Sequence, residues 1–336
     1  MPRKYSHRRS HRRLSSKKRN KTKKKSKKKS KKVRGGGTVK AQDLKTRLPE
    51  DMFGEIREMH PLLTPKLTNA TIKRAVRDYL NGGARKQRVV TKYGDISNWD
   101  VSNVTNMYGM FGNVAGMFED AIYFNQPLNK WNVSNVTNMN YMFRGAESFN
   151  QPLNKWDVSK VKSMFNMFVG AISFNQPLNK WDVSNVTNMQ IMFLDATSFN
   201  QPLDNWNVSN VEYMNSVFAF ANSFNQPLNN WNVSNVTDMG GMFRNASSFN
   251  QPLNNWNVSN VTHMGGMFMY ASSFNQPLNN WNVSNARGMW NMFRGAESFN
   301  QPLNNWNVSN MTDTEGMFRK ATSFNQPLHA PWYWYG

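Results

Sequence analysis

From Leu128 to Gln151 the chain reads LNKWNVSNVTNMNYMFRGAESFNQ, and close copies of this stretch follow one another along the sequence. The pentapeptide FNQPL recurs every 25 residues, beginning at Phe124, Phe149, Phe174, Phe199, Phe224, Phe249, Phe274, Phe299 and Phe324. Tryptophan keeps the same spacing at Trp131, Trp156, Trp181, Trp206, Trp231, Trp256, Trp281 and Trp306. A fixed period of this kind is the signature of a tandem-repeat architecture, in which each unit stacks on its neighbours.

The first copy begins at Ile96 and makes nine copies in all, but its Trp99 lies 32 residues before Trp131. The seven additional residues resemble a local duplication, because NMYGMFG is followed by NVAGMFE. Since seven residues make about two helical turns, we expect one longer helix to absorb them without breaking the stack.

The spacing of apolar residues within one copy predicts a strand, a cap, a helix and a return loop. Trp131 and Val133 alternate with polar residues, which is typical of a short strand with one buried face. Ser134 and Asn135 then offer side chains that cap helices. A helical stripe follows at steps of three and four: Val136, Met139, Met142, Phe143 and Ala146.

One such unit cannot bury its own apolar face, whereas stacked units form continuous columns of Trp, Val, Met and Phe. We therefore expect an α/β repeat fold, a solenoid with one short parallel strand and one short helix in each 25-residue coil. The Asn that follows each Phe, from Asn125 to Asn325, occupies a fixed place in every coil. We expect these amides to form a ladder that bonds neighbouring backbone, because buried backbone groups need partners.

The consensus FNQPLNNWNVSNVTxMxxMFxxAxS resembles the 25-residue BspA-like leucine-rich-repeat family, which occurs in bacterial surface proteins, mycoplasma lipoproteins, protists and large DNA viruses. The resemblance covers Ile96 to Leu328, and YGDIS at Tyr93–Ser97 is similar to the usual lead-in of that family. It implies a leucine-rich-repeat-like solenoid with a role in adhesion or protein interaction, and it brings no catalytic residues. The poly-lysine front end more closely resembles members encoded by large DNA viruses.

The net charge of +22 is concentrated at the N-terminus of this 336-residue chain. Residues 1–34 hold 19 of the 42 basic side chains and no acidic one, which leaves 23 basic and 20 acidic side chains for the rest. Such a tail repels itself and has little apolar area to bury, so we expect residues 1–37 to be disordered.

Three partners suit the basic tail: the phosphates of a nucleic acid, the nuclear import machinery, and an anionic membrane surface. Nucleic acid or import is favoured, although Tyr5, its only aromatic residue, makes base stacking weak. The candidate contact residues are Arg8, Arg9, Arg12, Arg13, Lys17, Lys18, Lys23, Lys24, Lys25, Lys27, Lys28 and Lys29.

The apolar stripes between the tail and the repeats predict a helical cap over residues 38–95. One helix is expected around Met52–Met59, and a second from about Asn69 to the stop at Gly82-Gly83. A cap is needed because the end of a stack exposes core side chains and unpaired backbone. The repeats then occupy residues 96–328, and the aromatic residues 329–336 are expected to cover the last coil or to act as a docking peptide.

No motif in the chain indicates an enzyme, a cofactor or a metal. The chain has no Cys, and its five His residues lack the spacing of metal ligands. The NVS and NVT tripeptides match glycosylation acceptors but are better explained as parts of the turn. No apolar run is long enough to span a membrane, and no secretory signal follows the basic start.

Variation between the copies points to the surface on which a partner could bind. It concentrates at the residues after the first Met, after Met-Phe and after Ala, which a helix would place opposite its buried stripe. A contiguous apolar stripe there would mark an interface, whereas isolated surface apolar residues need no explanation. The candidate residues on this outer helix face are Phe165, Val169, Ile191, Leu194, Tyr213, Phe220, Tyr270 and Trp290.

These observations favour a non-enzymatic interaction scaffold that is intracellular, with nuclear or virion association as specific possibilities. Its solenoid would bind a protein partner, centred on the third to fifth copies, and its tail would bind nucleic acid or direct import. The alternative is a structural or surface component, such as a virion or adhesin-like protein. The sequence leaves the partner and the oligomeric state open.

Overall fold

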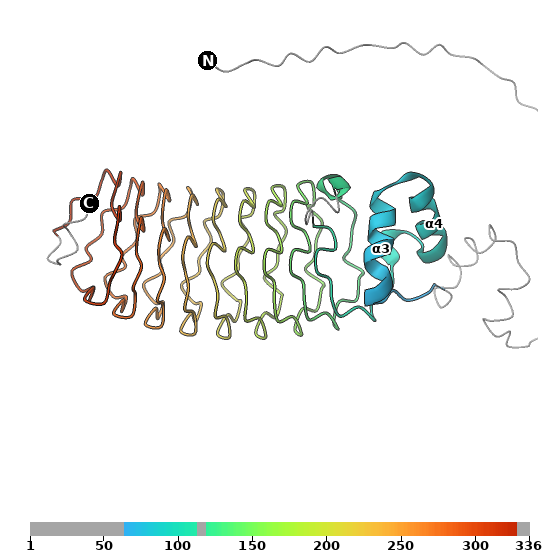
Figure 1. Ribbon diagram of the computed structural model, residues 1–336, viewed down its shortest axis with the longest axis horizontal. Helices are drawn as coiled ribbons and strands as arrows, with labels where there is room; N and C mark the ends of the chain where they lie inside the picture. The colour runs from blue at the N-terminus through green and yellow to red at the C-terminus, as the bar shows by residue number, and fades with distance from the viewer. Residues whose placement is uncertain (1–63, 113–118, 328–336) are drawn as a thin grey trace, which may run out of the picture. The chain divides into compact units, whose positions relative to one another are not determined.

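The computed structural model describes residues 64–112 and 119–327, which lie within one compact unit spanning residues 48–336. Two α-helices, α3 (Asn69–Leu80) and α4 (Gly83–Tyr93), precede a row of coils (Figure 1). Two short 3-10 helices, η2 (Ile96–Asn98) and η3 (Glu119–Tyr123), belong to the first coil. The basic tail, the helix expected at Met52–Met59 and the aromatic residues 329–336 lie outside the described residues.

Helix α3 forms where the apolar stripe predicts it. At its start, Thr71 Oγ1 accepts a hydrogen bond from the backbone N–H of Thr68 at 3.0 Å. Its buried face consists of Ile72, Ala75, Val76 and Tyr79. The helix ends before Gly82, whose φ of 68° is in the left-handed region that glycine adopts readily.

Helix α4 was not predicted, because it buries only Val89 and Tyr93 and so lacks a wide apolar stripe. Both helices nevertheless cover the first coil. The rings of Tyr79 and Tyr93 pack against the Trp99 indole, with centroids 5.8 and 6.0 Å apart. Leu67 N–H donates to Asp100 O at 2.8 Å, and Thr68 pairs with Asn103 in a parallel bridge.

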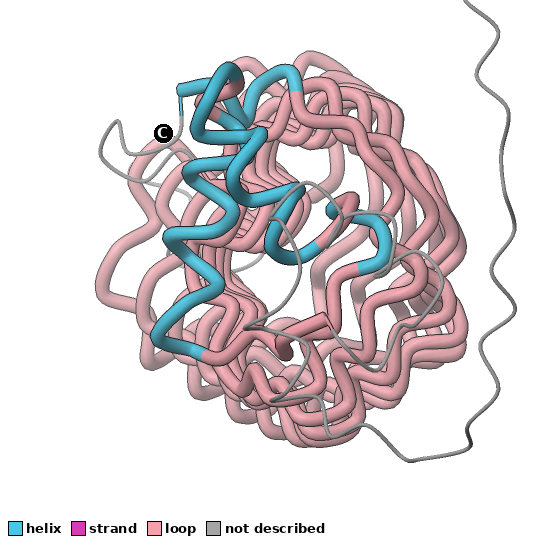
Figure 2. The backbone as a smooth tube through the Cα atoms, turned by 90° about the vertical axis from the view of Figure 1, so that its right-hand side faces the viewer, coloured by secondary structure: helices cyan, strands magenta, loops and turns pink. Residues whose placement is uncertain are grey.

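The coils are held side by side by one β-bridge each rather than by strands. Asn106 pairs in parallel with Asn138, Asn138 with Ser163, and so on to Gly288 with Asp313. Seen from the end, the coils overlie one another as loops (Figure 2). Within the described part of residues 124–327 no strand or helix is present, so the expected strand and helix in each coil are wrong.

Successive tight turns replace the expected helix. In the second coil, turn A spans Met139–Met142 and turn B spans Phe143–Ala146, each closed by a hydrogen bond from the fourth residue to the first. The third residue of each turn, Tyr141 or Gly145, has a φ of 59° or 68°. A positive φ at that position alone defines a type II turn and cannot occur within a right-handed helix.

The backbone groups that a helix would pair within itself are instead paired between coils. Tyr141 N–H donates to Phe165 O at 2.9 Å, and Phe143 N–H donates to Met167 O at 2.9 Å. The next donor, Gly145 N–H, bonds to Val169 O at 2.6 Å. Every second N–H therefore bonds the following coil, which satisfies the backbone without regular secondary structure.

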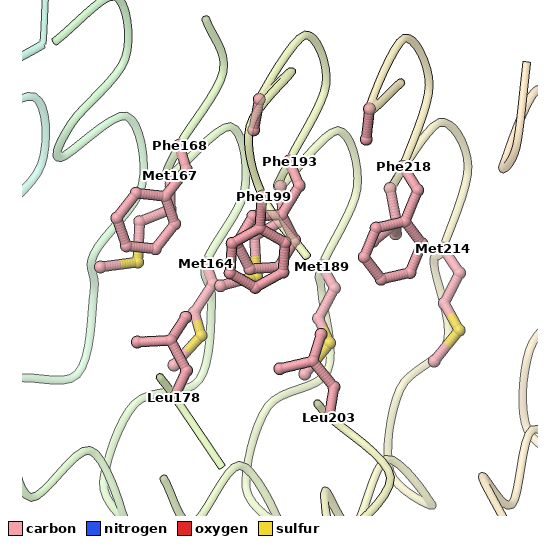
Figure 3. Packing of buried hydrophobic residues seen from close by; sticks show 14 of the residues in the cluster. Met164, Met167, Phe168, Leu178, Met189, Phe193, Phe199, Leu203, Met214 and Phe218 are labelled. Carbon is pink, nitrogen blue, oxygen red and sulfur yellow. The ribbon is translucent and has the colours of Figure 1, made fainter. Parts of the chain in front are cut away.

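The core consists of the predicted columns. From Trp156 to Trp306 successive indoles stack with centroids 6.3–6.5 Å apart and planes within 3° of parallel. Phe168, Phe193 and Phe218 form a second column, with Met164, Met189 and Met214 beside it (Figure 3). These side chains are almost completely buried. The stacked aromatic rings thus link each coil to the next throughout the core.

Two polar ladders accompany the columns. From Trp156 onward each indole N–H donates to a leucine carbonyl of the preceding coil, as in Trp181 Nε1 to Leu153 O at 3.0 Å. The Asn ladder is confirmed: Asn175 Oδ1 accepts from the backbone N–H of Asn200 at 3.0 Å and from Gln201 Nε2 at 2.9 Å. These amides are half-buried at the edge of the core.

The longer first copy keeps the register of the stack. Trp99 stacks on Trp131 with centroids 6.2 Å apart and planes at 11°, although their separation in sequence is larger than in later copies. Residues 113–118 of the insertion lie outside the described residues, and η3 follows them. The expected single longer helix is therefore not what residues 107–112 form, because Met110 N–H closes a turn onto Met107 O.

Candidate interaction surface

The eight candidate partner-binding residues lie on the turns and at the bridges, so their expected placement on a helix face is wrong. Turn A carries Phe165, Ile191 and Trp290, and turn B carries Val169, Leu194, Phe220 and Tyr270. Tyr213 is the residue that forms the bridge of the fifth coil. The two turns are consecutive in each coil, so these residues follow two neighbouring lines along the stack.

None of the eight residues is part of the buried core. Tyr213 and Trp290 are the most exposed, at 41% and 46% of their surface. The other six are half-buried. An apolar side chain that is half-buried between neighbouring coils presents one face to solvent, so these lines can make contact with another molecule.

Three of the residues occupy the left-handed position of their turns. Ile191, Phe220 and Tyr270 have φ values of 60°, 60° and 58°. This conformation is unfavourable for side chains other than Gly and Asn, and most of all for a β-branched residue such as isoleucine. Most matching positions in other coils hold Gly, Asn or another polar residue, as at Gly109, Asn166 and Gly241, although Tyr141 also occupies one.

Neighbouring coils cover some of the aromatic rings. The Arg244 guanidinium lies over the Phe220 ring at 5.4 Å from its centroid, and Arg294 lies over Tyr270 at 5.8 Å. A side chain on Gly265 would overlap the Trp290 indole. Gly265 of the seventh coil thus makes room for an aromatic residue of the next coil.

A second aromatic row lies at the beginning of the stack and was missed in the sequence. Tyr108 and Tyr141 have ring centroids 5.1 Å apart, and Tyr141 and Phe165 have centroids 5.2 Å apart. Lys73 of α3 stands over Tyr108 at 5.0 Å, and Arg144 stands over Tyr141 at 5.7 Å. The signal available was the aromatic residue one or two places before Met-Phe in each of the first three copies.

Two aspartates in the Trp-flanking turns are more acidic than usual. The hydroxyl and the backbone N–H of Ser159 donate to Asp157, and these bonds lower the pKa of Asp157 despite opposition from partial burial. Partial burial raises the pKa of Asp100, but hydrogen bonds from Ser102 and the charge of Lys66 outweigh it, so the net shift is downward. Both carboxylates act as turn-forming acceptors.

The described residues contain no helix of the length and apolarity needed to cross a membrane. They also contain no group of three or more His, Cys, Asp or Glu side chains arranged to hold a metal ion. The candidate surface therefore consists of turns A and B and of the aromatic row at the beginning of the stack.

The stacked columns and repeated turns define a tandem-repeat protein. Three overlapping stretches, residues 88–193, 173–273 and 250–333, match the family described as "Mycoplasma protein of unknown function, DUF285". These stretches cover well over half of the chain, so the chain belongs to this family. The match agrees with the BspA-like repeat resemblance but does not bear on the viral members. No curated protein and no solved structure matches the chain.

Proposed function

We propose that this protein is a non-enzymatic scaffold of the leucine-rich-repeat solenoid class that binds a protein partner along turns A and B. The observation that carries the proposal is that the constant positions of each repeat are buried, whereas the variable positions lie at the surface. The Trp, Phe and Asn positions are constant, and the Met positions vary only at Val217 and Thr314. These residues form the core and its ladder. The positions that vary lie on the turns at the surface, where Leu194 and Val169 present apolar groups.

A pull-down with the chain as bait identifies the partner, and a substitution on turn B then tests the surface. Leu194→Ser removes an apolar group without disturbing a left-handed residue, so it should weaken binding by more than about 1 kcal/mol if Leu194 is an anchor. Met269→Ser changes the same turn position in the seventh coil and is the matched control. Equal affinity of the two variants for the partner would contradict docking on the third to fifth coils.

We also propose that the basic tail binds nucleic acid or directs import, which would favour an intracellular and nuclear location. The support is its charge density, with 19 basic side chains in residues 1–34. Phosphate contacts release counterions, so this binding should weaken steeply as salt rises. A chain that lacks residues 1–37 should lose most of its nucleic-acid affinity and any nuclear accumulation of the expressed protein. Unchanged affinity at the same salt would refute the tail proposal.

A surface or structural role is the second candidate. It is favoured by the resemblance of the repeats to the BspA-like family, which occurs in bacterial surface proteins. Recovery of the protein in purified virus particles or in a surface-shaved cell fraction would support that role. Recovery from the nucleus alone would support the scaffold.

A further inference from the structure

The solvent side of α3 and α4 carries a dense cluster of positive charge on residues that belong to neither turn A nor turn B. Residues 69–93 contain seven Lys or Arg and only one acidic residue, Asp78. Arg74, Arg77, Arg85 and Arg88 line an open hollow of about 510 Å³ together with Asp78. We call these four arginines the arginine cluster.

Most of this charge is not neutralised within the described residues. Asp78 forms two long ion pairs, with Arg74 Nε at 3.8 Å and with Arg77 Nε at 4.0 Å. No acidic side chain in the described ranges forms an ion pair with Arg85 or Arg88. One carboxylate therefore faces four guanidinium groups, and a multiply charged anion would fit such a hollow. Guanidinium groups bind phosphate through paired N–H donors, which makes a phosphate ligand suitable.

The burial pattern argues against a lipid surface as the source of the phosphate. A helix that lies on a membrane inserts its apolar face among the lipid chains. The apolar face of α3, formed by Ile72, Ala75, Val76 and Tyr79, is already buried against the protein. Val90 is the only large apolar side chain of α3 or α4 that counts as exposed. The two helices thus offer charge without an apolar face to insert.

An aromatic row that begins at Lys73 of α3 favours nucleic acid over an acidic peptide. Lys73 precedes Arg74 on α3, and its ammonium group stands 5.0 Å from the centre of the Tyr108 ring. Tyr108 leads to Tyr141 and then to Phe165, with ring centroids 5.1 and 5.2 Å apart, and all three rings are half-buried. Aromatic rings next to a positively charged groove are the features that bind single strands, because bases stack on the rings while the backbone follows the charge.

We propose that the arginine cluster binds the phosphodiester backbone of a single-stranded nucleic acid, whose bases stack on Tyr108 and Tyr141. This site adds a contact within the folded part to the nucleic-acid role proposed for the tail, and it does not require the tail to bind. Phosphate contacts make binding depend on salt. Each arginine that touches a phosphate therefore steepens the plot of the logarithm of the binding constant against the logarithm of the salt concentration, which we call the salt slope.

Arginine footprinting of the full chain tests the site directly. Phenylglyoxal modifies accessible guanidinium groups, and mass spectrometry reports each one separately, with and without a short mixed-sequence single-stranded DNA. We expect the oligonucleotide to protect Arg77, Arg85 and Arg88, and to leave the exposed Arg244, Arg287 and Arg319 of later coils modified. Protection of all six arginines to the same degree, or of the tail arginines alone, would overturn the proposal. The tail arginines report on the tail proposal independently.

A matched pair of variants provides the second test. Replacement of Arg77, Arg85 and Arg88 by Gln removes three positive charges, and replacement of Arg244, Arg287 and Arg319 removes the same number elsewhere. The first variant should reduce the log–log salt slope of oligonucleotide binding by roughly 2, at about 0.7 for each single-strand phosphate contact. The control variant should leave that slope nearly unchanged, and Tyr108→Ala should weaken binding several-fold.

The remaining outcomes discriminate between ligands. Restoration of affinity by Arg→Lys at the three cluster positions would show that the first variant is folded and that charge is what binds. If the cluster variant loses affinity for polyglutamate, or for phosphatidylserine vesicles, as strongly as for the oligonucleotide, the proposal of a nucleic-acid site is wrong. Equal salt slopes for the cluster and control variants would also refute it.

Discussion

At the scale of single residues, the third position of each turn imposes the strongest local constraint in the repeat. Gly145, Gly170 and Gly295 occupy it in turn B of their coils, and each has a positive φ. Gly and Asn accept this conformation, whereas other side chains cost roughly 1–2 kcal/mol each. The sixth coil fills both turn positions favourably, with Gly241 and Asn245, while Ile191 of the fourth coil does not.

Ile191→Asn should therefore relieve strain, because Asn occupies the same turn position at Asn166 and Asn291 with a positive φ. The control is Leu194→Asn, which removes a similar half-buried side chain at a turn position that lacks a positive φ. We expect the free energy of unfolding of the Ile191 variant to exceed that of the control by about 1 kcal/mol or more. Denaturant titration measures both, and a lower stability of the Ile191 variant would contradict the argument.

Asp157 predicts a dependence on pH. The pKa of Asp157 in the folded state is lowered by the hydrogen bonds from Ser159, so it lies below the pKa in the unfolded state. Its contribution to stability is then present above the unfolded-state pKa and disappears as the pH falls through the folded-state pKa. Asn132 makes the same bonds to Ser134 without a charge, which shows that an amide fits this turn.

Asp157→Asn should thus leave the melting temperature near neutral pH almost unchanged and reduce its fall in acid. Asn207→Asp is the converse variant, since Ser209 N–H donates to Asn207 Oδ1 at 3.1 Å. Asn207→Asp should steepen the fall of the melting temperature at acidic pH. Melting temperatures measured from neutral pH down to about pH 2 test both variants. Identical acid-side slopes for the two variants and the unaltered chain would refute the assignment.

At the scale of the structural element, the ladders make each coil depend on the next. Asn175 Oδ1 accepts two hydrogen bonds from the following coil. Asn175→Ala leaves the backbone N–H of Asn200 without its acceptor and should cost about 1–3 kcal/mol. Asn205→Ala alters an exposed amide and should change the free energy of unfolding by less than about 0.5 kcal/mol. Denaturant titration measures the loss of unfolding free energy in both variants. Equal losses would mean that the ladder contributes little to stability.

The sequence predicted the columns but not the turns, and the reason lies in one spacing. Met139, Met142, Phe143 and Ala146 are separated by three, one and three residues. A helix stripe produces this spacing, and so do two consecutive turns that each close from the fourth residue to the first. The discriminating signal was the recurrence of glycine at one place, as at Gly109, Gly241 and Gly266. A helix interior would not repeat glycine there.

The candidate site was predictable in part for the same reason. Variation between copies located the surface positions, such as Leu194 and Val169, because any architecture places variable residues outside a constant core. It could not reveal that Ile191 and Phe220 are left-handed, since that depends on the turn type. Nor could it reveal the arginine cluster, because α4 lacks an apolar stripe and the nearly neutral charge of the body hides its local excess.

At the scale of the whole molecule, the stack should tolerate the loss of one complete repeat. Deletion of residues 176–200 joins Asn175 to Gln201 and places Trp206 over Trp156 in the same register. Because stability in such arrays is approximately a sum over neighbouring units, the shortened chain should fold with a lower melting temperature. Deletion of residues 176–187 shifts the register and should abolish the near-ultraviolet circular dichroism of the tryptophan column. Loss of folding in both deletions would show that the coils are not interchangeable.

The direction of the indole bonds has a consequence for synthesis on the ribosome. From Trp156 onward each indole N–H donates to a leucine carbonyl of the coil made before it, as in Trp181 to Leu153. The turn N–H groups of the same coil bond the coil made after it, as Phe193 N–H does with Val217 O. A nascent chain can therefore add each coil to a finished template as it emerges, with α3 and α4 already made to seed the first. The order of translation and the order of assembly then coincide.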